Sequence, residues 1–204
     1  MQNNQLEIER LASYIKSLKN FTFFNFAEGN YDHMGATITD AILQAGLKYE
    51  TVVRPRAEKI KQFLEAKTTS GFFNLIQKEG LSKLINWVNP EKLSRIENIV
   101  QFFIKEKIET EIDLKEWLLV EENLVKLKSL RGVGDKTVDY FKILVGFSGS
   151  AIDRHLLKFL HHAGIDVRDY NRAKTIIDGA ADALSIDRRR FDYSIWKYMS
   201  DKKM

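Results

Sequence analysis

Apolar positions recur along most of the chain with the three- and four-residue spacing of an amphipathic α-helix. Four segments show this spacing most clearly: Ile8, Leu11, Ile15 and Leu18; Leu93, Ile96, Val100 and Phe103; Ala173, Ile176, Ile177 and Ala180; Phe191, Ile195 and Tyr198. The sequence lacks convincing segments with the two-residue period of strands joined by hairpin turns. The pattern therefore predicts an all-α protein of roughly ten helices.

Local signals mark one helix start and one interruption. Asn89 followed by Pro90 predicts an N-cap and a proline in the first helical position. The segment FTFFNFAEGNYDHMG breaks the helical period, and its phenylalanines could stack on bases, but we favour packing under a helical lobe. These phenylalanines are Phe21, Phe23, Phe24 and Phe26. Gly29 and Asn30 predict a connection between an N-terminal arm and a middle lobe.

Composition is that of an ordinary soluble globular protein: 204 residues, 44% hydrophobic and 29% charged. We expect a cytoplasmic, nucleoid-associated protein without a membrane span, because no apolar run is long enough and the N-terminus MQNNQLEIER is unlike a secretory signal. The absence of cysteine excludes disulfides, thiolate zinc sites and cysteine-ligated iron–sulfur clusters. A net charge of +4 is a weak indication of a nucleic-acid partner.

Two short apolar helical faces flank the stretch LRGVGDKTVDY, which runs from Leu130 to Tyr140. The first face comprises Leu124, Leu127 and Leu130, and the second comprises Val138, Phe141 and Val145. Between them, Gly132 and Gly134 permit positive φ angles and close backbone approach, and Val133 can plug the space between the two helices. The pattern predicts a helix–hairpin–helix motif.

A hairpin of this kind can bind phosphate, because the amides at the start of its second helix have no intrahelical acceptor and lie at the positive end of the helix dipole. DNA backbone is the expected ligand, bound without regard to base. The candidate contacts are Arg131, Gly132, Val133, Gly134 and Thr137. The alternative is a simple glycine-linked corner between two helices.

These segments resemble the helix–hairpin–helix DNA glycosylases of the endonuclease III and 8-oxoguanine glycosylase type, which use a hairpin lysine and a later aspartate. Here the lysine is Lys136, and AIDRHLLKFL supplies Asp153 with His155 two residues after it. SRIENIVQF resembles the family's helix that leads to the hairpin, and AILQAGLKYETV resembles the segment of its DNA-wedging loop. Arg131 stands where the family usually has proline, and Arg154 stands where it usually has threonine or valine. These departures distinguish the chain from a typical endonuclease III, so the resemblance does not identify the base that is excised.

The resemblance implies a DNA-glycosylase fold of two helical lobes. One lobe spans residues 31–136 and ends in the hairpin, and the other combines residues 1–30 with residues 137–204. DNA would lie in the cleft between them, with Lys136 and Asp153 at its mouth. The residues expected to contact DNA beyond the hairpin are His155 and, filling the gap left by a flipped base, Gln44, Leu47, Lys48 and Tyr49. For Gln44, Leu47, Lys48 and Tyr49, the alternative is that they form only the end of a helix and the loop after it, and we give the two interpretations equal weight.

The resemblance also implies a possible monovalent cation on the hairpin carbonyls from Leu130 to Gly134, with no other cofactor. No spacing of side chains predicts a metal site. His161 and His162 are adjacent and cannot share one helical face.

The expected chemistry begins with a base flipped out of the stack. The carboxylate of Asp153 would stabilise positive charge at C1′ as the glycosidic bond breaks. Lys136 would attack C1′ as a neutral amine, because the helix dipole and burial both lower its pKa, and Asp153 would accept its proton. The resulting imine would undergo β-elimination, which cuts the strand.

The sequence thus predicts a monomeric, bifunctional DNA glycosylase and AP lyase that acts on double-stranded DNA with a damaged base, for which we favour an oxidised one. One alternative is a monofunctional glycosylase for alkylated or mismatched bases, in which Asp153 activates water. A second alternative is a non-catalytic DNA-binding protein, in which Lys136 contacts only phosphate and Asp153 only caps a helix.

Overall fold

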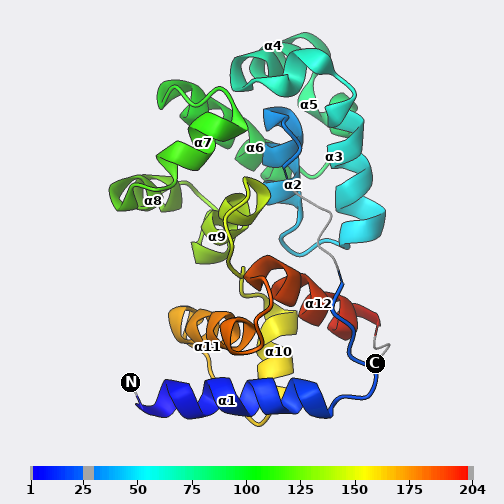
Figure 1. Cartoon of the computed structure of the whole chain (residues 1–204). Helices are drawn as coiled ribbons and strands as arrows, with labels where there is room; N and C mark the ends of the chain where they lie inside the picture. The colour runs from blue at the N-terminus through cyan, green and yellow to red at the C-terminus, as the bar shows by residue number, and fades with distance from the viewer. Residues whose placement is uncertain (1, 25–29, 202–204) are drawn as a thin grey trace. The chain divides into compact units, whose positions relative to one another are not determined.

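The computed structural model describes residues 2–24 and 30–201. Every regular element in this part of the chain is helical, which confirms the predicted all-α fold (Figure 1). The chain forms two compact units: unit 1 comprises Met1–Ala27 and Phe147–Met204, and unit 2 comprises Glu28–Gly146. None of the described helices is long and apolar enough to cross a membrane.

The division between the units falls after Gly146, whereas the lobes expected from the sequence would meet at Lys136. A boundary at Lys136 would cut α9 (Asp135–Leu144) in its first turn. The helix instead packs on α2 (Met34–Leu43) and α8 (Glu121–Lys128), so the whole of α9 belongs to unit 2. Lys136 therefore belongs to unit 2.

Unit 2 is built around α2, whose ten residues are all buried. Its sequence MGATITDAIL is short and mostly apolar or small, which suits a helix packed on every side. Around it lie α3 (Arg54–Lys61), α4 (Thr69–Glu79), α6 (Pro90–Lys105) and α9. The other elements of this unit are the π-helix η1 (Tyr49–Val53), the 3₁₀-helix η2 (Leu64–Lys67), α5 (Leu81–Ile85) and α7 (Glu111–Trp117).

Helix α6 begins as the sequence predicts. The side chain of Asn89 accepts a hydrogen bond from the amide of Lys92 at 3.2 Å, and Pro90 occupies the first helical turn. This N-cap satisfies one of the amides that a helix start leaves without a partner. The confirmed start fixes the position of Lys92 in the first turn of α6.

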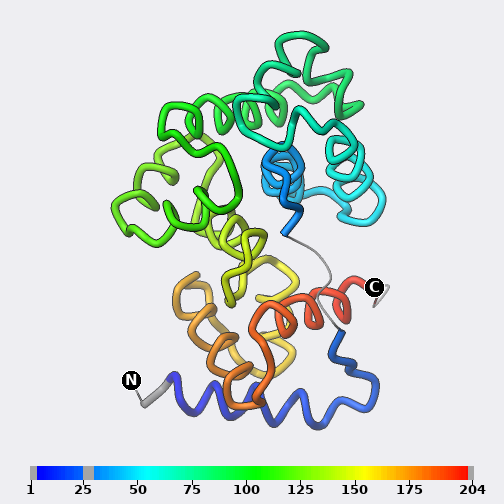
Figure 2. The backbone as a smooth tube through the Cα atoms, turned by 45° about the horizontal axis from the view of Figure 1, so that its top comes forward, coloured from blue at the N-terminus to red at the C-terminus, as the bar shows by residue number. Residues whose placement is uncertain are grey.

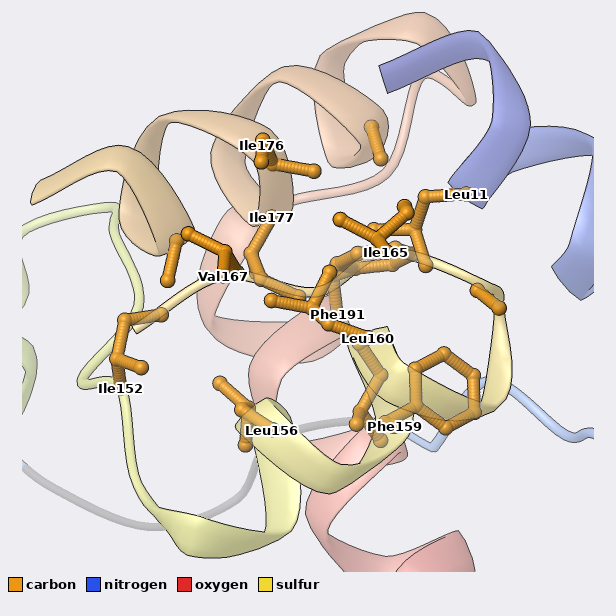
Figure 3. Packing of buried hydrophobic residues seen from close by; sticks show 14 of the residues in the cluster. Leu11, Ile152, Leu156, Phe159, Leu160, Ile165, Val167, Ile176, Ile177 and Phe191 are labelled. Atoms are coloured by element: carbon orange, nitrogen blue, oxygen red, sulfur yellow. The ribbon is translucent and has the colours of Figure 1, made fainter. Parts of the chain in front are cut away.

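Unit 1 consists of α1 (Gln2–Ser17), α10 (Arg154–His162), α11 (Tyr170–Ala183) and α12 (Arg188–Asp201). Helix α1 packs on α11, and α12 packs on both α10 and α11. Figure 3 shows the shared core, in which Leu11, Phe159 and Ile177 are completely buried. Complete burial of each such side chain contributes about 1.5–3 kcal/mol.

The N-terminal aromatic segment contributes to the same core. Phe21 lies 5.8 Å from Phe159 and 5.3 Å from Phe23 between ring centroids. Packing rather than base stacking is therefore confirmed for Phe21 and Phe23. Phe26 and Gly29, which also carried predictions, lie outside the described residues.

Candidate functional site

The predicted hairpin lies between Lys128, the last residue of α8, and Asp135, the first residue of α9 (Figure 2). Gly132 has a φ of +82°, and a Cβ atom there would come within 2.4 Å of the Arg95 guanidinium. Gly134 has a φ of −115°, an extended conformation that any residue adopts. Only Gly132 therefore uses the positive φ that both glycines were expected to permit.

Two of the expected DNA-contacting side chains in the hairpin face the interior of unit 2. Val133 is 7% exposed and Thr137 is 6% exposed. Their amides donate to the carbonyls of Leu130 and Gly134, each at 3.0 Å. Any contact of Val133 or Thr137 with DNA would have to use the backbone.

The first turn of α9 is open to an anion. Its N-cap, Gly134, offers no side-chain acceptor to the first amides of the helix, and a Cβ at this position would meet nothing within 4 Å. Asp135 forms an ion pair with Lys128 at 3.1 Å, and the side chain of Arg131, 82% exposed, forms one with Glu91 at 3.2 Å. The turn can thus receive a phosphate oxygen at its amides.

Lys136 extends from this first turn to the end of α2. Its Nζ donates to Oε1 of Gln44 at 2.7 Å. One turn further along α9, the hydroxyl of Tyr140 donates to Oδ1 of Asp40 at 3.1 Å. These two contacts tie antiparallel α2 and α9 together at successive turns, so the position of Lys136 is set by the packing of α9 on α2.

Asp40 is the buried carboxylate of this pair of helices. Besides Tyr140, the hydroxyls of Tyr31 and Tyr49 donate to its Oδ2 at 2.7 and 3.2 Å. Burial raises the pKa of Asp40 to about 6, and the tyrosine hydrogen bonds only partly oppose this shift. Three hydroxyl donors satisfy the carboxylate in a completely buried position.

The four residues expected to fill the gap of a flipped base take different positions. Gln44 holds Lys136, and its Nε2 donates to the carbonyl of Ala41 at 3.4 Å. The Tyr49 hydroxyl is held by Asp40, Leu47 is half-buried, and Lys48 is exposed. Two of the four side chains, those of Gln44 and Tyr49, are therefore held by hydrogen bonds within unit 2.

Asp153 belongs to unit 1, where it is the N-cap of α10. Its Oδ1 accepts from the amides of His155 and Leu156 at 2.7 and 3.0 Å. Its Oδ2 lies 3.1 Å from Nδ1 of His155. The side chain is 15% exposed, so its carboxylate is fixed by the helix it caps.

The structure adds polar residues that the sequence pattern did not single out: Lys92, Asp40, Tyr31 and Tyr140. A lone carboxylate inside the otherwise uncharged stretch MGATITDAIL is a signal for Asp40, since a buried charge needs partners. The four-residue spacing of Lys136 and Tyr140 places them on one helical face. Nothing in the sequence indicates Lys92.

Comparisons with known proteins agree with this architecture. Residues 89–200, more than half of the chain, match a family described as a domain of unknown function, DUF8548. A comparison with curated proteins gives no significant match. Among solved structures, the 8-oxoguanine DNA glycosylase of Methanocaldococcus jannaschii is similar, with a TM-score of 0.53 and 17% identity over 100% of this chain and 88% of that one. A likeness at this identity concerns the fold, and it confirms the DNA-glycosylase architecture expected from the sequence.

Proposed function

The chain belongs to the DUF8548 family, and we propose that it is a DNA glycosylase that also cleaves the strand at the site of the lost base. The observation that carries this proposal is the position of Lys136. Its amine follows a glycine hairpin, lies in the first turn of α9 and is held by Gln44 at 2.7 Å. A helix–hairpin–helix that binds phosphate beside an anchored lysine suits covalent chemistry on a DNA sugar.

In this reaction Lys136 acts as the nucleophile. Its Nζ forms a bond to C1′ of the sugar as the bond from C1′ to the base breaks, and the base leaves with the electron pair. The nitrogen then carries two protons: one passes to the departing base, and the other passes to O4′ as the C1′–O4′ bond of the sugar ring breaks, which gives an imine. Abstraction of a C2′ proton then breaks the C3′–O bond and releases the 3′ phosphate, which cuts the strand.

Asp153 supplies the fixed negative charge that this reaction needs. Positive charge develops at C1′ as the glycosidic bond breaks, and a preorganised carboxylate stabilises it. The two amides at the start of α10 hold that carboxylate in one orientation. His155 supports the same orientation through Oδ2.

The substrate we propose is double-stranded DNA that contains an oxidised base, bound by a monomer. 8-Oxoguanine is the first base to test, because the similar solved structure is an 8-oxoguanine DNA glycosylase. A monovalent cation on the hairpin is part of the proposal. The carbonyl of Leu130 accepts one amide, from Val133, and its second lone pair suits such an ion.

Borohydride reduction in the presence of duplexes with a single damaged base tests the proposal. The wild-type protein should form a covalent adduct with DNA, and Lys136→Gln should form none. Release of a base without an adduct, lost in Asp153→Asn, would instead support a monofunctional glycosylase.

One observation favours the non-catalytic alternative. Asp153 makes the hydrogen bonds of an ordinary N-cap, which is a complete structural role for an aspartate at this position. On that alternative the protein binds duplexes equally well with and without a damaged base, Asp153→Asn leaves binding unchanged, and no base is released from any duplex.

A further inference from the structure

The segment that leads to Asp153 has no helical backbone of its own. Residues 147–153 lie between α9 and α10 without regular secondary structure. Within this segment Ser150, Ala151 and Ile152 are all buried. Buried amides and carbonyls that no helix pairs need partners elsewhere. The position of Asp153 therefore depends on what holds the three residues before it.

Side chains of α11 hold the first and the last of these three residues. The Nζ of Lys174 donates to the carbonyl of Ser150 at 2.6 Å, and the hydroxyl of Ser150 donates to Oδ1 of Asp178 at 2.7 Å. Lys174 and Asp178 lie one turn apart and form an ion pair at 3.3 Å. The amide of Ile152 donates to the hydroxyl of Tyr170 at 3.3 Å. Helix α11 thus fixes the three residues at both ends.

Asp192 of α12 holds the middle residue. Its Oδ2 accepts from the amide of Ala151 at 2.7 Å. A hydrogen bond to an ionised carboxylate is stronger than one between neutral groups. The backbone of Asp192 is itself fixed, because the neighbouring Phe191 is completely buried in the core of unit 1. Ala151, two residues before Asp153, therefore takes its position from α12.

The side chain of Ile152 adds an apolar anchor directly before Asp153. It belongs to the core of unit 1 together with Leu156, Ile177 and Phe191 (Figure 3). On its other side Asp153 accepts from the first-turn amides of α10. The carboxylate is thus located by α10 after it and by contacts with α11 and α12 before it.

We propose that Asp192 is a positioning residue for Asp153: by holding the amide of Ala151, it sets where the carboxylate of Asp153 stands relative to the charge that develops at C1′. The inference rests on the proposed function of Asp153 and adds a second carboxylate to it. In this role Asp192 touches no substrate atom and acts through the backbone of residues 151–153. Small displacements of a catalytic group slow a reaction strongly, which gives such a residue a measurable effect.

The test removes the acceptor at position 192 and then restores it. Asp192→Ala takes the carboxylate away from the amide of Ala151, and Asp192→Asn restores an oxygen acceptor without the charge. The rate of base release is measured in single turnovers on a duplex with one 8-oxoguanine. Fluorescence anisotropy gives the dissociation constant for an undamaged duplex of the same sequence.

The two measurements separate positioning from binding. Asp192→Ala should release the base about tenfold to a hundredfold more slowly than wild type, because the carboxylate of Asp153 is displaced. Its dissociation constant should equal that of wild type, and Asp192→Asn should recover most of the rate. A defect that lies wholly in the dissociation constant, or an Asp192→Asn variant as slow as Asp192→Ala, would overturn the inference.

Ser194→Ala is the matched control on the same helix. Ser194 also accepts a backbone amide from a distant segment, that of Phe24, at 2.9 Å. Its side chain is completely buried, so the substitution should lower stability without loosening the segment before Asp153. The wild-type rate of base release is expected. A rate as low as that of Asp192→Ala would mean that any bond lost from α12 slows the reaction, which would overturn the inference.

Asp192→Glu takes the place of the alanine variant if Asp192→Ala does not fold. It keeps the charge but moves the carboxylate outward by one methylene, about 1.5 Å, so the segment must shift to keep the bond. Slower base release is expected here as well. A wild-type rate in Asp192→Glu would overturn the inference.

Hydrogen exchange without DNA separates the inference from the proposed function. Two-dimensional NMR reports exchange at the amides of His155 and Leu156, which the carboxylate of Asp153 accepts. In Asp192→Ala both should exchange about fivefold faster than in wild type, whereas the amide of Met199, near the other end of α12, should not change. Unchanged exchange at His155 and Leu156 overturns the role of Asp192 alone. Faster exchange, in a protein whose wild type releases no base from any duplex, overturns the proposed function.

Discussion

The starts of α9 and α10 place opposite charges at the same kind of helix end. At α10 the carboxylate of Asp153 accepts two first-turn amides, at 2.7 and 3.0 Å. At α9 the N-cap is Gly134, which has no side chain to accept an amide, and the first turn carries the cationic side chain of Lys136. A helix N-terminus stabilises an anion and destabilises a cation. The same backbone feature therefore suits the carboxylate that α10 carries at its start and does not suit a cation at the start of α9.

The two helix starts hold the carboxylate of Asp153 and the amine of Lys136 in different ways. Asp153 is held by its own helix, within three residues of sequence. Lys136 is held by a different helix, through Gln44 and the neighbouring contacts of α2 with α9. The carboxylate is fixed locally, whereas the amine depends on the packing of unit 2.

The largest effect is expected from the charge at the start of α10. Asparagine caps a helix about as well as aspartate, so Asp153→Asn should keep the fold but lower the rate of base release by two to three orders of magnitude. Single-turnover kinetics on a damaged duplex measure this rate. Asp169→Asn is the control, because Asp169 caps α11 through the amide of Arg172 at 2.7 Å. Equal losses in both variants would mean that only capping matters at Asp153.

Asp40, the buried carboxylate of unit 2, should affect the free energy of unfolding, whereas Asp153 should affect the rate of base release. The pKa of Asp40 is raised to about 6, so between about pH 4 and pH 6 the folded protein holds a proton that the unfolded chain releases. Stability from this group is complete below pH 4 and is lost as the pH rises through 6, by about 3 kcal/mol. Urea unfolding should show this loss in wild type relative to Asp40→Asn. Parallel pH profiles of the two proteins would contradict it.

Most of the fold followed from sequence because helix periodicity and capping are local. The faces around Leu11 and Ile177 and the Asn89 cap depend on residues within a few positions of each other, and the structure confirms all three. The position of the hairpin could be predicted for the same reason. Its backbone differs from the expectation, because only Gly132 of the two glycines has a positive φ.

The surroundings of the candidate site could not be predicted in the same way. Lys136 and Gln44 lie far apart in sequence, as do Lys92 and Ile42, and no local spacing links them. For Tyr49 the sequence left gap filling and a plain loop as equal alternatives, and it gave no sign of the hydrogen bond from the Tyr49 hydroxyl to Asp40. Such contacts depend on how α2, α6 and α9 pack together, which periodicity alone does not specify.

A negative charge beside Lys136 would make the start of α9 resemble that of α10. Gln44→Glu places a carboxylate where Oε1 now accepts from Lys136 and so favours the ammonium form. We expect imine formation to slow about tenfold at pH 7 and to recover at alkaline pH. Gln77→Glu, at an exposed position on α4, adds the same charge elsewhere and should change little. Recovery at acidic rather than alkaline pH would contradict this account of Lys136.

The smallest effects are expected in the hairpin, where the two glycines should differ. Gly132→Ala forces a side chain into a positive φ and should lower the free energy of unfolding by about 1–2 kcal/mol. Gly134→Ala should change stability by less than about 0.5 kcal/mol, because a Cβ there meets nothing within 4 Å, but it should weaken DNA binding, because the methyl group fills space that is open to a phosphate. Thermal unfolding and fluorescence anisotropy measure the two effects. Equal destabilisation by both substitutions would show that Gly134 also has a constrained backbone.

The central claim, that the amine of Lys136 attacks the sugar, is tested most directly by locating the bond. The protein is trapped with borohydride on a duplex that carries one 8-oxoguanine, digested with protease and nuclease, and analysed by tandem mass spectrometry. The account predicts a reduced sugar on Nζ of Lys136 in the wild-type protein and no adduct in Lys136→Gln. A sugar attached to Lys92 or to the N-terminal amine, or an adduct that persists in Lys136→Gln, would contradict it.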